Sequence, residues 1–267
     1  MLYHSIIIND SIAAAETYSP PTDCKILYDV IRVTEGDFLF LNDHINRLNQ
    51  SAEILGVRLV LSVDDIRNQL EKLMHQNGIQ TGNIKIEYYF YAEKLEYQAV
   101  YFIQHHYPTK DEYLNGVKTS LFTAERTNPN AKIIQHYLRE QTNQLIIEKN
   151  IYEVILVHPD GYITEGSRST FFMVKNGTVY TAPIADVLPG ITRKYVLQAC
   201  CDLSVPFEEK RITPEQLSDM DAVFIAGTSP KILPVSQVDE CIFETDNAIV
   251  KQLMKKYDEM AGIDHVL

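Results

Sequence analysis

Apolar and polar residues alternate over several short stretches in the first half of the chain, and such alternation predicts β-strands. We expect strands at residues 4–9, 25–33, 38–41, 83–91 and 97–105. Between the third and fourth strands, apolar residues recur at spacings of three and four, which predicts two amphipathic helices. Asn42 or Asp43 would cap the first helix, and Ser62 the second. The core face of the first helix would consist of Ile45, Leu48, Ala52 and Leu55.

The second half predicts a longer series of strands, at residues 117–123, 154–157, 170–174, 179–181, 222–226 and 232–238. One helix would begin at or just after Lys132 and end near Lys149, and its buried stripe would consist of Leu138, Thr142, Leu145 and Ile146. Two more helices would follow, one opening at Gly190 and one over residues 246–261. The loop Pro108–Asn115 would separate a small N-terminal α+β domain, residues 1–115, from a larger C-terminal domain, residues 116–267.

Composition narrows the possible partners. Lys and Arg total 24 and Asp and Glu total 36, and the net charge of −12 argues against nucleic acid or an anionic membrane as the main partner. The four cysteines show no metal-type spacing, so we expect no metal site and reduced thiols in a cytoplasmic protein. The chain shows no signal peptide and no apolar run of membrane-spanning length.

A carboxylate stands between two predicted strands, within residues 161–172. Glu165 follows the apolar run 154–157, precedes the run 170–174, and is followed at once by Gly166, which allows close approach of backbone or ligand. Because an unpaired buried charge is very costly, this carboxylate must be solvated or have a specific partner. For an isolated glutamate, a solvated hairpin corner is the ordinary interpretation.

Two basic residues occupy positions that favour chemistry. Lys132 would lie at a helix start, where the macrodipole disfavours a cation and lowers the pKa of an amine, as a lysine that condenses with carbonyl groups requires. Arg47 shares a helix face with His44 and Ser51, from which it would contact an anion. Each also fits an ordinary solvated residue when taken alone.

Two segments are typical of anion sites. Gly190, Ile191 and Thr192 open a helix, which offers free backbone N–H groups and a hydroxyl. Thr228 and Ser229 come just after a buried strand that ends in a glycine. Each signal is weak alone, but a reactive lysine, a carboxylate, an arginine and two anion sites together are what pyridoxal phosphate needs from a protein.

The residues that carry this chemistry also occur in motifs. These are His44-Ile45-Asn46-Arg47-Leu48 with Ser51-Ala52, Thr164-Glu165-Gly166-Ser167, Leu188-Pro189-Gly190-Ile191-Thr192-Arg193, and Gly227-Thr228-Ser229. In order and spacing the chain resembles the class IV (fold-type IV) pyridoxal-phosphate aminotransferases, which include branched-chain and D-amino-acid transaminases and aminodeoxychorismate lyase. The resemblance covers essentially the whole chain. It implies an α/β (α+β) fold of two domains, with a mixed, barrel-like sheet in the larger one, the cofactor in the cleft between them, and a homodimer.

The resemblance implies a role for each matched residue. Lys132 matches the lysine that forms the Schiff base and moves the substrate proton, Glu165 the carboxylate paired with the pyridine nitrogen, and Arg47 a phosphate contact. The other expected cofactor contacts are Ile191, Thr192 and Thr228 at the phosphate, Leu188 against the ring, and Tyr137 near the cofactor's O3′.

The substrate side departs from the family pattern. D-amino-acid transaminases carry a substrate-binding arginine where this chain has Tyr88-Tyr89-Phe90-Tyr91. Lys85 is the nearest counterpart of the arginine found in branched-chain enzymes, and a lysine is a point charge rather than a bidentate fork. Tyr28 and Ser229 complete the expected substrate contacts.

These features lead to a functional hypothesis in amino-acid metabolism. The chain would be an aminotransferase that moves an amino group between a small amino acid, branched-chain ones included, and a 2-oxo acid such as 2-oxoglutarate. The alternative on the same scaffold is aminodeoxychorismate lyase, which releases pyruvate and 4-aminobenzoate. A third hypothesis, motivated by the altered segments around Cys24 and Phe90, is a non-catalytic binding module.

Overall fold

Residues 3–263 are described by a computed structural model, and their contacts fall into two units. Unit 1 comprises the chain up to His106 together with Ala131–Ile134, and unit 2 comprises Tyr107–Asn130 and the chain from Gln135 onward. Unit 1 is therefore built from two separate stretches of sequence, and the second of these stretches contains Lys132.

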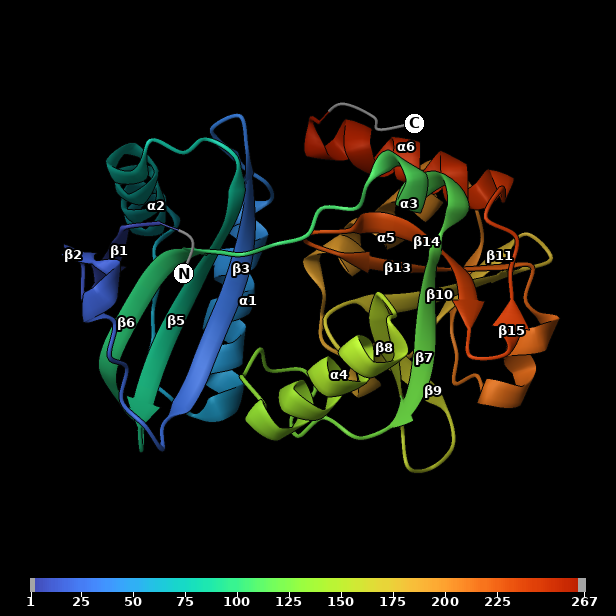
Figure 1. Ribbon diagram of the computed structural model, residues 1–267, viewed down its shortest axis with the longest axis horizontal. Helices are drawn as coiled ribbons and strands as arrows, with labels where there is room; N and C mark the ends of the chain where they lie inside the picture. Colours follow the sequence, from blue (N-terminus) through green and yellow to red (C-terminus); the bar gives the residue numbers. More distant parts are fainter. Residues whose placement is uncertain (1–2, 264–267) are drawn as a thin grey trace. The chain divides into compact units, whose positions relative to one another are not determined.

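Unit 1 is a six-stranded antiparallel sheet with two α-helices, in the strand order β2-β1-β6-β5-β3-β4. Figure 1 shows β6, β5 and β3 side by side with α1 and α2 behind them. The strands are β1 (Ser5–Ile8), β2 (Ser11–Ala14), β3 (Lys25–Thr34), β4 (Asp37–Phe38), β5 (Gly82–Tyr91) and β6 (Lys94–Ile103). The helices are η1, a 3₁₀ turn (Ala15–Thr17), α1 (Leu41–Leu55) and α2 (Val63–Asn77).

The sheet of unit 1 has two different faces, because successive side chains along a strand point to opposite sides. One face packs against the apolar stripes of α1 and α2 through a core that includes Leu27, Ile31, Ile84, Ile86 and Val100. The predicted core face of α1 is confirmed, with Ile45, Leu48 and Ala52 buried and Leu55 partly buried against the same core. The opposite face carries a smaller cluster of Ile6, Ala99 and Tyr101, with Tyr18 and Tyr97 packed against it.

The predicted ends of the helices and strands in unit 1 are confirmed only in part. Ser62 caps α2 as expected, since its hydroxyl accepts the Asp65 N–H. The predicted caps Asn42 and Asp43 are wrong, because α1 begins at Leu41 and its N-cap is Phe40, in the left-handed conformation. The third strand is also shorter than the expected 38–41, because Leu41 already belongs to α1.

The outer edge of β3 is covered by two segments. At one end, Val33 and Thr34 pair with β4. At the other end, Leu27 bridges Ile133, and the hydrogen bonds from Tyr28 N to Lys132 O and from Ile134 N to Ile26 O are both 3.0 Å long. The expected helix start at Lys132 is therefore wrong. The β-branched Ile133 and Ile134 favour an extended backbone, and the edge of β3 supplies its hydrogen-bond partners.

Unit 2 is a nine-stranded mixed sheet that curls into a half-barrel, in the order β12-β11-β10-β13-β14-β7-β8-β9, with β15 paired to β14. Its strands are β7 (Val117–Thr123), β8 (Glu153–Val157), β9 (Ile163–Gly166), β10 (Thr170–Lys175), β11 (Thr178–Thr181), β12 (Phe207–Glu209), β13 (Ala222–Gly227), β14 (Lys231–Val238) and β15 (Cys241–Ile242). Its helices are α3 (Lys110–Asn115), α4 (His136–Lys149), η2 (Ile184–Asp186), α5 (Ile191–Asp202), η3 (Pro214–Asp219) and α6 (Ala248–Ala261).

Two helices of unit 2 differ from expectation. The predicted loop Pro108–Asn115 contains α3, which is stabilised by a capping box between Thr109 and Glu112. In α4 only Thr142 of the expected stripe is buried, while Leu138, Leu145 and Ile146 are half-buried. Within residues 3–263, no helix is both long and apolar enough to cross a membrane.

Gly116 provides a test of packing where α3 meets β7. Its φ is +68°, and an added Cβ would lie 2.6 Å from Thr245 Cγ2 and 2.9 Å from Ser236 N. Gly177 has a similar φ of +80°, but an added Cβ there meets nothing within 4 Å. We expect Gly177→Ala to lower the free energy of unfolding by about 1 kcal/mol. Gly116→Ala should lower it by about 2–4 kcal/mol, because a clash adds to the strain. Urea unfolding of both variants measures the difference, and equal losses would contradict the packing argument.

Candidate active site

A buried carboxylate on β3 anchors the polar groups of unit 1. Asp29 is fully buried and receives the Arg47 guanidinium at two points, from Nε to Oδ2 at 3.0 Å and from Nη2 to Oδ1 at 2.6 Å. His44 Nδ1 lies 3.0 Å from Asp29 Oδ1. The predicted helix face of His44, Arg47 and Ser51 is thus buried, and the anion that Arg47 contacts in this structure is Asp29.

Burial and pairing act in opposite directions on these groups. Burial alone would raise the pKa of Asp29, but the charges of Arg47 and then His44 outweigh it and hold that pKa well below 3.8. Burial is the largest effect on His44 and lowers its pKa in spite of the neighbouring Asp29. Asp29 is therefore charged and His44 neutral at pH 7, which leaves one close ion pair with Arg47.

Lys132 lies beside this group and over an aromatic ring. Its backbone N–H donates to Ser51 Oγ at 3.2 Å, and its carbonyl accepts the Tyr28 N–H. Its Nζ lies 4.9 Å from the centroid of the Tyr28 ring. Lys85 Nζ lies 5.1 Å from the same centroid and forms an ion pair with Glu87. Unit 1 thus brings together four predicted site residues, Arg47, Lys132, Tyr28 and Lys85.

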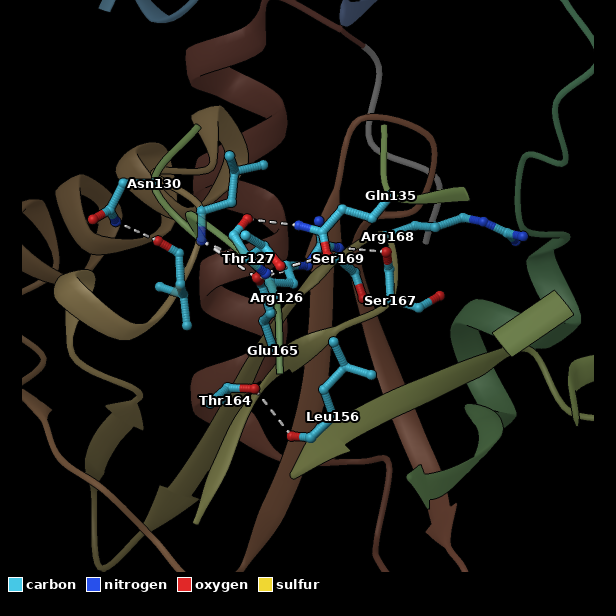
Figure 2. A network of polar contacts seen from close by, with 12 residues as sticks. Arg126, Thr127, Asn130, Gln135, Leu156, Thr164, Glu165, Ser167, Arg168 and Ser169 are labelled. Carbon is cyan, nitrogen blue, oxygen red and sulfur yellow. Dashed lines mark hydrogen bonds and ion pairs between the residues drawn. The ribbon is translucent and has the colours of Figure 1, made fainter. Parts of the chain in front are cut away.

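In unit 2, Glu165 is buried on β9 with a cationic partner. Its Oε1 lies 3.0 Å from Arg126 Nε, so the ordinary solvated corner does not apply. Arg126 also donates from Nη2 to the Ser167 carbonyl at 2.6 Å, and Figure 2 shows this arginine between the two residues. The Leu188 N–H lies 3.4 Å from each Glu165 oxygen. A cavity of about 120 Å³ borders Glu165 and Arg126.

A second buried carboxylate holds the hairpin that carries Glu165. Glu153 on β8 accepts hydrogen bonds from Ser167 Oγ at 2.7 Å and Ser169 Oγ at 3.0 Å, and from the Arg168 N–H at 3.1 Å. An added Cβ on Gly166 would collide with Ser169 and contact Glu153. The close approach that Gly166 permits is therefore made by the chain itself, and it fixes the backbone beside Glu165.

The two segments that were predicted to bind an anion both lie close to Thr170. Thr170 Oγ1 would lie 3.0 Å from a Cβ added to Gly190, the residue that precedes α5. Thr170 also pairs with Ala226 on β13, next to Gly227 and the turn that contains Thr228 and Ser229. The first turn of α5, in which Ile191 and Thr192 are buried, and the β13–β14 turn therefore both lie close to Thr170. The expected roles of Ile191, Thr192 and Thr228 at the phosphate stay predictions.

Tyr137 occupies a different environment. It lies on α4 with 74% of its surface exposed, and its hydroxyl is 3.0 Å from Gln141 Nε2. Its expected place near the cofactor's O3′ stays a prediction.

Comparison with known proteins agrees with this geometry. The family model of the class IV amino-transferases matches residues 26–238. A D-alanine aminotransferase from Bacillus licheniformis is 30% identical over 225 residues, which cover 80% of this chain and 78% of that relative. The chain belongs to the class IV aminotransferase family. A branched-chain-amino-acid aminotransferase from Pseudomonas aeruginosa is 27% identical, with 77% of this chain and 72% of the relative covered.

Solved structures show the same fold for this class IV aminotransferase. A branched-chain amino acid aminotransferase from Escherichia coli has a TM-score of 0.84 at 20% identity, covering 97% of this chain and 95% of that one. The predicted family, the predicted fold-type IV architecture and the prediction of an aminotransferase are confirmed. Family membership also sets aside the hypothesis of a non-catalytic binding module.

Three partners in this aminotransferase were missed by sequence reasoning. Asp29 is the one acid within the apolar run Ile26–Val33, and a carboxylate in such a strand requires a cation. Glu87 stands in the same way among the tyrosines of β5. Arg126, which precedes the segment Asn128-Pro129, gave no comparable signal, because nothing local indicates that its partner lies on β9.

The Asp29 ion pair generates a pH prediction. Because the folded pKa of Asp29 is depressed, the pair stabilises the fold at pH values above 3.8, and this stabilisation is lost as the pH falls below that value. Asp29→Asn leaves Arg47 buried without its counter-charge, so we expect a loss of about 3–5 kcal/mol in the free energy of unfolding at pH 7. The loss should shrink as the pH falls from about 4 toward about 2.

Urea unfolding at a series of pH values measures both quantities. The exposed Asp37 supplies the control, and Asp37→Asn should follow the parent protein at every pH. If the free energies of unfolding of the parent and of Asp29→Asn fall in parallel between about pH 4 and about pH 2, Asp29 does not cause this pH dependence.

Proposed function

We propose that this class IV aminotransferase uses pyridoxal 5′-phosphate to move an amino group between a small amino acid and a 2-oxo acid. The placement of Lys132 carries the proposal. Its backbone is fixed by hydrogen bonds with Tyr28 and Ser51, and its amine lies over the Tyr28 ring, so the amine has a defined position. A positioned amine is what both nucleophilic attack and proton transfer require.

Each residue predicted from the family resemblance has the chemistry that one of the cofactor's groups requires. The N–H groups and hydroxyls of Ile191, Thr192 and Thr228 would hold the phosphate, since a helix N-terminus favours an anion. Arg47 would add its positive charge, moderated by Asp29. Glu165, which forms an ion pair with Arg126, would hold a proton on the pyridine nitrogen. Leu188 would pack against that ring, and Tyr137 would lie near O3′.

When bound, pyridoxal phosphate supplies an aldehyde that condenses with amines and a ring that withdraws electrons from the substrate Cα. The chain supplies the proton transfers. Lys132 takes the proton from Cα and returns a proton at the carbon that receives the amino group. Arg126 forms an ion pair with Glu165, and the Glu153 hydrogen bonds keep its backbone in place.

The substrate contacts in this proposal are Tyr28, Lys85 and Ser229. Tyr28 presents an aromatic face between two lysine side chains. Lys85 would bind the substrate carboxylate as a point charge. Relatives named for D-alanine and for branched-chain amino acids support a small substrate.

We further propose that the enzyme works as a homodimer in the cytoplasm. The family resemblance, which implies a homodimer, supports this assembly. Light scattering after size-exclusion chromatography tests the assembly, and a mass of 30.6 kDa would contradict it.

The central test is Lys132→Ala. Without the amine, the protein should no longer attach pyridoxal phosphate covalently, and transamination should fall by at least about 10²–10⁴-fold. Borohydride reduction followed by peptide mass spectrometry locates the attachment in the parent protein. Lys118→Ala removes an exposed lysine of β7 and should keep both the attachment and the rate. Full transamination by Lys132→Ala would overturn the assignment.

The substrate is found by adding L- and D-amino acids to the cofactor-loaded protein and following its visible absorption band. We expect the band to bleach with a small amino acid and to recover on addition of a 2-oxo acid. A band that no amino acid bleaches, together with pyruvate release from aminodeoxychorismate without an acceptor, would instead establish the lyase.

A further inference from the structure

The face of the unit 1 sheet that α1 and α2 leave uncovered carries a closed polar network around Glu87. Lys85 Nζ lies 2.5 Å from Glu87 Oε1. The other carboxylate oxygen, Oε2, accepts hydrogen bonds from the hydroxyls of Tyr18 at 2.7 Å, Tyr89 at 2.8 Å and Tyr101 at 2.9 Å. The four donors come from two strands and the turn after η1, so the network ties this face together.

Both oxygens of Glu87 are therefore occupied, and the carboxylate is ionised. Burial would raise the pKa of Glu87, but the charge and hydrogen bond of Lys85, followed by the tyrosine hydroxyls, lower it. Burial raises the pKa of Tyr18 to about 12 and those of Tyr89 and Tyr101 further, so all three phenols keep their protons and donate. The Tyr18 and Tyr89 hydroxyls also lie 2.6 Å apart, so the hydroxyls form a connected network that holds Glu87 beside Lys85.

Lys85 is the accessible end of this network. Its side chain is 19% exposed, whereas that of Glu87 is 3% exposed. An ammonium has three donors, and Glu87 Oε1 accepts one of them. The Lys85 ammonium also lies over the ring of Tyr28, the ring that Lys132 Nζ covers at 4.9 Å. Two lysine nitrogens thus share one aromatic ring.

We propose that Glu87, with Tyr18, Tyr89 and Tyr101, is a positioning residue that fixes the Lys85 ammonium to receive the carboxylate of the amino-acid substrate. This inference rests on the proposed function, in which the substrate amine reacts where Lys132 acts. An α-amino acid carries its amine and its carboxylate on one carbon. Of the two lysines at the Tyr28 ring, Lys132 would act where the amine reacts and Lys85 would bind the carboxylate. An arginine binds a carboxylate through a rigid, planar guanidinium, whereas a lysine side chain is flexible. The network would supply the missing rigidity by restricting the position of the Lys85 ammonium.

The test separates position from charge. Lys85→Met removes the ammonium, whereas Glu87→Asp keeps both charges and withdraws the carboxylate by one methylene. The matched control is Glu96→Asp, because Lys94 and Glu96 on the same sheet form an ion pair at the same i, i+2 spacing but are 80% and 41% exposed. Tyr101→Phe loosens Glu87 without changing any charge, and it serves if Glu87→Asp does not fold.

Calorimetry with the cofactor-loaded, full-length proteins uses propionate and propionamide as probes, which differ in the carboxylate alone. The parent should prefer propionate by about 10- to 100-fold, the value of a charge-assisted hydrogen bond. Lys85→Met should bring the ratio close to one. Glu87→Asp should lower it on the order of tenfold, Tyr101→Phe should lower it by less, and Glu96→Asp should leave it unchanged.

Turnover gives an independent readout. With the best amino donor, Glu87→Asp should raise KM by the same factor as it lowers the propionate preference, while kcat changes less. A preference that survives Lys85→Met would place the carboxylate elsewhere. A preference lost in Lys85→Met but intact in both Glu87→Asp and Tyr101→Phe would overturn the positioning role. Failure of the proposed function is distinct from both, because the protein would then show no visible cofactor band.

Discussion

A carboxylate loses its hydration when it is buried, so it must gain a cation or a full set of donors. Within the described residues, Asp29, Glu87, Glu153, Glu165 and Asp258 are all buried, and each has such partners. Each has a partner on a different element: α1 for Asp29, β6 for Glu87, the β9–β10 hairpin for Glu153, the segment after β7 for Glu165 and β14 for Asp258. The pairs therefore fix the elements against one another as well as the charges.

The buried carboxylates differ in whether their partners are charged or neutral. Glu153 is held by hydroxyl and amide donors, which makes it a rigid joint within its hairpin. Asp29, Glu87 and Glu165 each have a cation, and each lies beside a group with a proposed role in chemistry: Lys132, Lys85 and the cavity at Glu165. Three of the four buried carboxylates with a cationic partner thus lie beside a group with a proposed role, whereas the fourth, Asp258, joins α6 to β14 through Lys231.

The sequence predicted features that depend on neighbours along the chain. The cap at Ser62, the apolar stripe of α1 and the start of α5 after Gly190 are local signals, and the family motifs are local as well. Features that depend on a distant partner were not predictable. The backbone at Lys132 is extended because it pairs with the edge of β3, which is far away in the sequence. Likewise, no residue near Arg126 or Arg47 in the sequence indicates that Glu165 or Asp29 is the partner.

The insertion of Ala131–Ile134 into unit 1 has a consequence for synthesis on the ribosome. The β3 edge at Ile26 and Tyr28 finds its partners after residues 107–130 have been made, although the strands of unit 1 end at Ile103. A nascent chain therefore carries an open strand edge, a template for mispairing, during this interval. The segment that closes this edge also contains Lys132, so the small sheet is completed in the same step that brings the Lys132 amine to unit 1.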